Sequence, residues 1–95
     1  MKDGLIRDLE AFLLQEDFGK NWDGAYQDVI PTIRKYFRSH GFEIREISEW
    51  ESPSREPELI ASKTDITVRV PWAEDRNGRS VVHLQAIQVQ LSQSA

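Results

Sequence analysis

Apolar side chains recur at helical spacing before Gly41 and at strand spacing after it. The first helix is predicted over 3–15, with Asp3 as its N-cap, because the apolar residues of this segment line up on one helical face. These residues are Leu5, Ile6, Leu9, Phe12 and Leu13. The following segment, 16–24, is rich in Gly, Asn and Asp and is predicted as a turn.

A second helix is predicted over 23–40, where apolar residues again form a broad stripe. Gly41 suits the left-handed turn that closes a helix. Pro31 interrupts the stripe, because proline lacks the backbone N–H and crowds the preceding turn. The helix therefore either bends at Pro31, or a separate helix starts at Asp28 with the proline in its first turn.

Alternating apolar residues predict strands in the rest of the chain. The predicted strands cover 42–48, 58–62, 64–73 and 80–91. Asn77-Gly78, between the last two strands, predicts a hairpin because both residues accept a positive φ.

These elements predict one small α+β domain over 1–95. Two N-terminal helices would pack on one face of a three- or four-stranded antiparallel sheet that ends in a β-hairpin. The other face of the sheet would be polar and solvated. It would carry Thr67, Arg69, Gln85, Gln88 and Gln90.

The composition limits the cellular compartments in which the protein is expected. The chain has 95 residues, a formal net charge of −4 and no cysteine, which excludes disulfides and thiolate chemistry. No apolar run approaches the ~20 residues that cross a bilayer. The first residues also lack the apolar core of a secretion signal. We therefore predict a cytoplasmic protein that does not contact a membrane.

Patterns typical of catalysis or metal binding are scarce. The acidic turn over 17–24 does not match the spacing of a calcium loop. His40 and His83 have neither the paired spacing of a zinc site nor a nucleophile motif near them. We predict no catalytic residue, no metal and no cofactor. An active site shared between two copies and built around His83 is the enzymatic alternative that one sequence leaves open.

The loop 48–57 is the preferred candidate for recognition. It is polar, it is bounded by prolines, and Trp50 within it either covers the core or stands exposed as an anchor. Trp22 and Trp72 belong to apolar stripes and are predicted in the core. Tryptophan and arginine dominate the energetics of protein interfaces. The predicted protein-contact surface is Glu49, Trp50, Glu51, Arg55 and Glu56.

An alternative contact surface is basic. It consists of Arg34, Lys35 and Arg38 on the second helix and Arg76 at the hairpin tip. Phosphate binding requires an excess of cations, which neither part of the chain has. Residues 1–40 carry six Lys/Arg against seven Asp/Glu, and residues 41–95 carry six against nine. Nucleic acid is therefore a disfavoured partner.

The sequence thus favours a non-enzymatic protein-protein interaction module. It would be a small acidic adaptor, or an inhibitor of the immunity, antitoxin or anti-defence type, with a protein partner. The alternative is a nucleic-acid-binding accessory protein that uses the basic surface. The long strand predicted near 81–91 could lie at a sheet edge and form a homodimer, because unpaired edges invite pairing.

Overall fold

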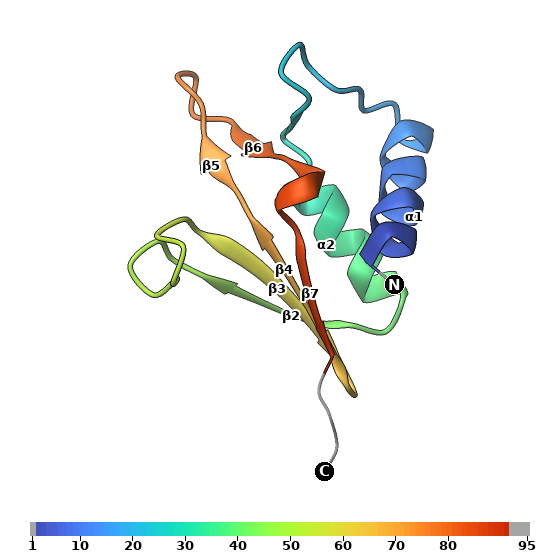
Figure 1. Cartoon of the computed structure of the whole chain (residues 1–95). Helices are drawn as coiled ribbons and strands as arrows, with labels where there is room; N and C mark the ends of the chain where they lie inside the picture. The colour runs from blue at the N-terminus through green and yellow to red at the C-terminus, as the bar shows by residue number, and fades with distance from the viewer. Residues whose placement is uncertain (1, 92–95) are drawn as a thin grey trace.

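The computed structural model describes residues 2–91, which form two α-helices, one short 3-10 helix and seven strands (Figure 1). The helical elements are α1 (Lys2–Gln15), α2 (Ile30–Ser39) and η1 (Leu84–Ala86). The strands are β1 (Tyr26–Gln27), β2 (Glu43–Ile47), β3 (Glu58–Lys63), β4 (Ile66–Pro71), β5 (Ala73–Glu74), β6 (Ser80–Val82) and β7 (Gln88–Leu91).

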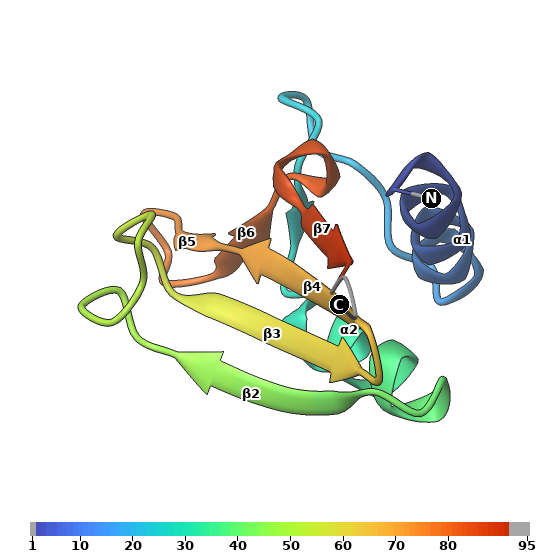
Figure 2. The same cartoon turned by 60° about the horizontal axis from the view of Figure 1, so that its bottom comes forward.

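The strands form two antiparallel sheets. Four of them lie side by side in the order β2-β3-β4-β7 (Figure 2). A smaller sheet has the order β1-β6-β5. The predicted α+β class, with two helices and antiparallel strands, is therefore confirmed. The strands divide between two sheets, however, where the sequence predicted one.

The register gives the four-stranded sheet one apolar and one polar face. Ala61 pairs with Ile44 and Val68, and Val68 pairs with Val89. Paired residues share a face, so these four side chains form an apolar row. The adjacent row, on the opposite face, is Arg45, Ile60, Arg69 and Gln88. Of the residues predicted for the polar face, Thr67, Arg69, Gln88 and Gln90 share it, whereas Gln85 lies in η1.

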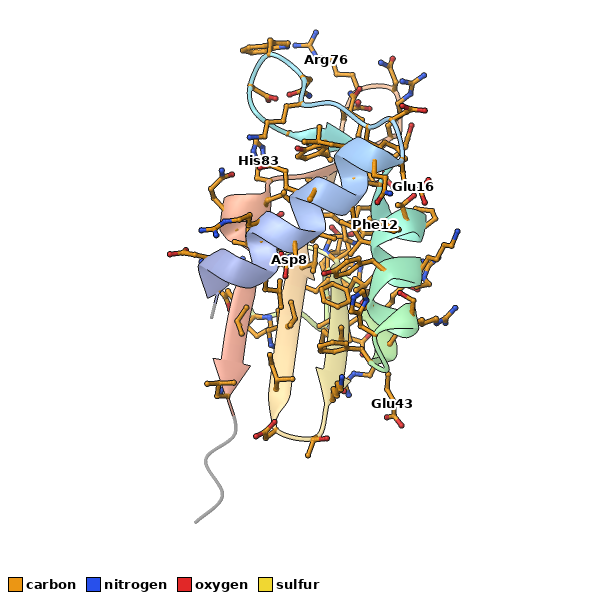
Figure 3. All side chains as sticks on the ribbon, turned by 90° about the vertical axis from the view of Figure 1, so that its right-hand side faces the viewer. Asp8, Phe12, Glu16, Glu43, Arg76 and His83 are labelled. Carbon is orange, nitrogen blue, oxygen red and sulfur yellow. The ribbon has the colours of Figure 1, made fainter. Side chains whose placement is uncertain are left out.

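The core lies between the apolar face and the helices. α2 packs against β2 and β3, and α1 packs against α2 and η1. Seen from the helix side, α1 crosses in front of the strands, and Phe12 contacts Tyr36 of α2 with ring centroids 5.1 Å apart (Figure 3). Leu9, Leu13 and Phe37 are fully buried in this core. No helix within residues 2–91 has the length and apolar content needed to cross a membrane.

Helix α2 is shorter than predicted and does not extend back to residue 23. β1 occupies part of the expected helix and pairs with β6. Asp28 has a φ of +58°, a left-handed conformation that interrupts a right-handed helix. α2 then begins at Ile30 with Pro31 in its first turn, where the missing N–H needs no partner. At the other helix, Asp3 lies in the first turn of α1 and is not its N-cap.

The segment 80–91, predicted as one long strand, is not a continuous strand. β6 ends at Val82, η1 intervenes, and β7 starts at Gln88 in the other sheet. The predicted strand 64–73 also divides, because β4 ends at Pro71 and Trp72 separates it from β5. Proline cannot donate to a strand ladder, so a strand ends readily there.

A hairpin is present at Asn77-Gly78, although the chain does not end with it. β5 and β6 pair antiparallel on either side of the loop 75–79. Of the two turn residues only Gly78 has a positive φ, of +75°. The loop is therefore wider than the two-residue turn that the dipeptide predicted, and the chain continues through η1 into β7.

Candidate functional site

A groove lies where the loop 48–57, between β2 and β3, meets the junction of β4 and β5. In Figure 1 this loop is at the left, below β5. The groove has a volume of about 490 Å³. Its walls are formed by Ser48, Glu49, Trp50, Arg55, Glu56, Pro57, Trp72, Ala73 and Glu74. We call this feature the Trp50 groove.

Four of the five predicted contact residues line the Trp50 groove. They are Glu49, Trp50, Arg55 and Glu56. Glu51 is not among the lining residues, and its Oε1 accepts hydrogen bonds from the Ser48 backbone N–H at 3.3 Å and from the Ser48 hydroxyl at 3.1 Å. Glu51 therefore closes a turn at the start of the loop.

The loop 48–57 is held by its own hydrogen bonds. The carbonyl of Ser48 accepts from the backbone N–H groups of Glu51 and Ser52, both at 3.1 Å. The carbonyl of Ser52 accepts from the N–H of Arg55 at 3.0 Å. Arg55 has a φ of +60°, a left-handed conformation that disfavours side chains with a Cβ and persists only where the surroundings impose it. The groove wall is thus preorganised.

A buried carboxylate anchors the loop to the sheet. Glu58, the first residue of β3, is only 4% exposed. Its Oε2 accepts a short hydrogen bond from the Ser52 hydroxyl and lies 3.4 Å from Nη1 of Arg69. The Ser52 hydroxyl also lies 2.8 Å from that of Ser54. A buried charge needs such partners, so Glu58, Ser52 and Arg69 together fix the position of the loop.

The two tryptophans of the groove have different environments. Trp50 is 89% exposed, so its indole stands in solvent and does not cover the core. Trp72 is partly buried and packs against the core. The N–H of its backbone donates to the Pro57 carbonyl at 3.0 Å, which ties the two sides of the groove together. Its indole Nε1 is buried and has no hydrogen-bond partner among residues 2–91.

The prediction for Trp22 is wrong, since this residue is 95% exposed. It lies in the segment 16–25, which loops away from α1 before β1 begins (Figure 1). The apolar stripe that seemed to include Trp22 belongs to a helix that starts only at Ile30. Helical periodicity therefore does not apply to its position.

Sequence reasoning missed Trp72 and Glu74 as groove residues. Trp72 was predicted in the core because it follows the alternation of β4, and no pattern in the sequence singles out Glu74. Pro71 was the available signal, because a strand that stops at proline releases the following residues from the sheet. The buried role of Glu58 had no sequence signal, since it depends on where Ser52 and Arg69 fold.

The hairpin beside the groove is braced by Asp75. Its carboxylate accepts from the backbone N–H groups of Asn77 at 2.8 Å and Arg79 at 3.0 Å, and from the side chain of Gln27 at 2.8 Å. These bonds, with that of Arg79 foremost, hold the pKa of Asp75 below its usual value. Asp75 thus supports the segment that places Glu74 at the groove.

The basic residues of the alternative surface do not form one patch. Arg34 donates to Glu46 at 2.8 Å, so its charge is already paired. Lys35 and Arg38 are exposed on α2. Arg76 lies at one end of the molecule, on the hairpin tip beyond the N-terminal end of α2 (Figure 3).

The histidines lie in separate places. His40 caps the end of α2 and packs on Tyr36 with ring centroids 4.3 Å apart. His83 is exposed between β6 and η1 (Figure 3). Across residues 2–91, no group of three or more His, Asp or Glu residues is placed to hold a metal ion. Comparison with protein-family models, curated proteins and solved structures finds no match to this chain.

Proposed function

We propose that this chain is a non-enzymatic protein-binding module, a small acidic adaptor or inhibitor of the immunity, antitoxin or anti-defence type. Its contact surface would be the Trp50 groove. The observation that carries the proposal is an indole, 89% exposed, on a hydrogen-bonded loop beside a hollow of about 490 Å³. Burial of a large, solvent-exposed apolar side chain by a partner lowers the free energy, so it favours binding.

The rigidity of the loop 48–57 supports this role. Binding costs free energy whenever a partner must order a flexible segment. Here the turn bonds at Ser48 and the buried anchor at Glu58 hold the loop before any partner arrives. Trp50 can therefore act as a preorganised anchor of the kind that dominates interface energetics.

The nucleic-acid alternative has weaker support. It relied on four basic residues acting together, yet Arg34 is paired with Glu46 and Arg76 lies on the hairpin tip, away from α2. The predicted homodimer through an edge strand remains a prediction. It would now depend on β7, because β6 is the middle strand of its sheet.

The proposal is tested with a library of random peptides displayed on phage, selected against the purified chain. Peptides that the chain enriches are then measured for binding to the wild type, to Trp50→Ala and to Trp22→Ala. Trp22→Ala is the matched control, because it removes an equally exposed indole outside the groove. We expect Trp50→Ala to weaken binding at least tenfold, about 1.4 kcal/mol, and Trp22→Ala to leave binding unchanged.

Two outcomes would reject the proposal. One is that the selection enriches no peptide. The other is that the enriched peptides bind Trp50→Ala as tightly as the wild type. Circular dichroism of each variant checks that the fold is retained.

A further inference from the structure

We infer that the Trp50 groove receives the side chain of an arginine from the partner protein. This inference rests on the proposed function and specifies the chemistry of the ligand. It is drawn from the charges that line the groove, from its two indoles, and from the poor fit of other side chains.

The lining of the groove is acidic. It includes three glutamates, Glu49, Glu56 and Glu74, and one cationic side chain, Arg55. Within residues 2–91 none of the three glutamates makes a salt bridge or a side-chain hydrogen bond. By contrast, Glu10 and Glu46 are each paired with a cation of this chain. The groove thus offers carboxylates whose partner would come from outside.

The aromatic residues add a second requirement. Trp50 and Trp72 both line the groove, and the face of an indole attracts cations through its negative quadrupole. The guanidinium of arginine is planar, so it can stack on an indole while its N–H groups bond a carboxylate in the same plane. A lysine ammonium is more strongly hydrated and lacks that flat face, so it matches the combination less well.

Acidic and apolar side chains fit the lining of the groove less well than arginine does. An acidic side chain would meet an excess of two negative charges. An apolar side chain would remove the carboxylates from water without giving them a partner, which costs free energy. A cation with a flat apolar surface satisfies both the indoles and the glutamates.

The test uses NMR spectroscopy of the indole N–H signals, which report each of the three tryptophans separately. The probes are capped pentapeptides with a central arginine, lysine or citrulline between glycines. Citrulline has nearly the shape of arginine and no charge. We expect the arginine peptide to shift the Trp50 signal with a Kd of about 1 mM, and the citrulline peptide to bind at least tenfold more weakly. Trp22 serves as the internal control and should not shift.

A set of variants separates local charge from net charge. The groove variant combines Glu49→Gln, Glu56→Gln and Glu74→Gln. The control variant combines Glu16→Gln, Glu43→Gln and Asp65→Asn, which remove the same charge from exposed sites outside the groove. Glu16 and Glu43 lie on other parts of the molecule (Figure 3). We expect the groove variant to lose about tenfold in affinity for the arginine peptide and the control to lose less than twofold.

The outcomes distinguish this inference from the function on which it rests. If arginine and citrulline peptides shift Trp50 equally, or if the two triple variants behave alike, the inference fails while peptide binding at the groove stands. If no peptide shifts Trp50, the inference fails as well. The phage selection with Trp50→Ala then decides independently whether the groove binds protein segments of another chemistry.

Discussion

The loops 16–25 and 48–57 each present a tryptophan that is almost fully exposed, and the tryptophan of the second loop borders the Trp50 groove. Trp22 is 95% exposed and Trp50 is 89% exposed. The difference lies in what surrounds each indole. Trp50 stands over a hollow lined by a second tryptophan and by glutamates, whereas Trp22 lines none of the pockets described for residues 2–91. Exposure of an aromatic residue is therefore not sufficient to define a site.

A glutamate anchors each loop, but the two anchors differ in burial. Glu10 of α1 accepts from the Tyr26 hydroxyl at 2.8 Å and pairs with Lys20 of the loop 16–25 at 2.9 Å. The side chain of Glu10 is 30% exposed, and that of Glu58 is 5% exposed. Water can replace the partners of Glu10 and has little access to Glu58. The loop 48–57 should therefore be the more rigid of the two.

The largest effect is expected for the buried anchor. Glu58→Ala leaves the Ser52 hydroxyl and the Arg69 guanidinium without their acceptor, so it should lower the free energy of unfolding by about 2 kcal/mol. Chemical denaturation measures this loss. In Glu58→Ala, the backbone amides of the loop 48–57 should exchange hydrogen faster than in the wild type, whereas those of the loop 16–25 should exchange at an unchanged rate. A loop 48–57 that stays protected in Glu58→Ala would show that its turn bonds suffice.

A smaller effect is expected where the loop 16–25 joins the core. Tyr26→Phe removes the hydrogen bond to Glu10 and should cost about 1 kcal/mol in the free energy of unfolding. Burial, and then the bond to Glu10, raise the pKa of Tyr26 to about 12.

The same tyrosine predicts a loss of stability at high pH. The unfolded chain ionises Tyr26 near pH 10, before the folded chain does. The stabilisation by Tyr26 is thus complete below pH 10 and is lost as the pH rises through about 12. Urea unfolding between these pH values should show that the free energy of unfolding falls less steeply with pH in Tyr26→Phe than in the wild type. Equal slopes for the two proteins would show that Tyr26 is not the source of the loss.

A still smaller effect is expected at the partly exposed anchor, Glu10. Hydrogen bonds from Lys20 and then Tyr26 hold the pKa of Glu10 below its usual value. Because the folded pKa is lowered, the stabilisation by Glu10 is fully present above its ordinary pKa of 4.5 and is lost as the pH falls through the folded value. Glu10→Gln should lower the free energy of unfolding by less than about 1 kcal/mol at pH 7, and the free energy of unfolding of this variant should fall less as the solution is acidified. Part of the fall should remain in the variant, because the pKa of Asp75 is also lowered.

The smallest effects on stability are expected for the two indoles. Trp50→Ala and Trp22→Ala should each change the free energy of unfolding by less than about 0.5 kcal/mol, because both side chains are exposed. Thermal unfolding compares them directly. A large loss for Trp50→Ala alone would mean that the indole supports the loop and is not free to contact a partner.

The comparison of the loops also shows where sequence reasoning succeeded. The proline-bounded segment 48–57 is recognisable as a loop from its composition, and four of the five residues predicted there as a contact surface line one groove. Local signals carried this result, because prolines and clustered polar residues mark a loop wherever it folds. The first helix was equally clear from its strong periodicity, and its observed bounds are Lys2–Gln15.

The failures share a different origin. The segment 80–91 reads as one strand, but its halves pair with different partners, β6 with β1 and β5, and β7 with β4. Trp22 fits an apolar stripe only if the helix begins before Asp28, whose φ is +58°. In both cases the local pattern is compatible with two structures, and long-range pairing selects one of them.

The sequence alone determined the α+β class, the first helix, the acidic balance of the chain and the position of the polar loop 48–57, because these depend on neighbours along the chain. Only the tertiary structure decided that Trp72 and Glu74 join the loop in a groove, and that Glu58 is buried beneath it. The physical reason is that these contacts connect residues of different strands. Their meeting is set by sheet register and by the burial of a charge among distant partners.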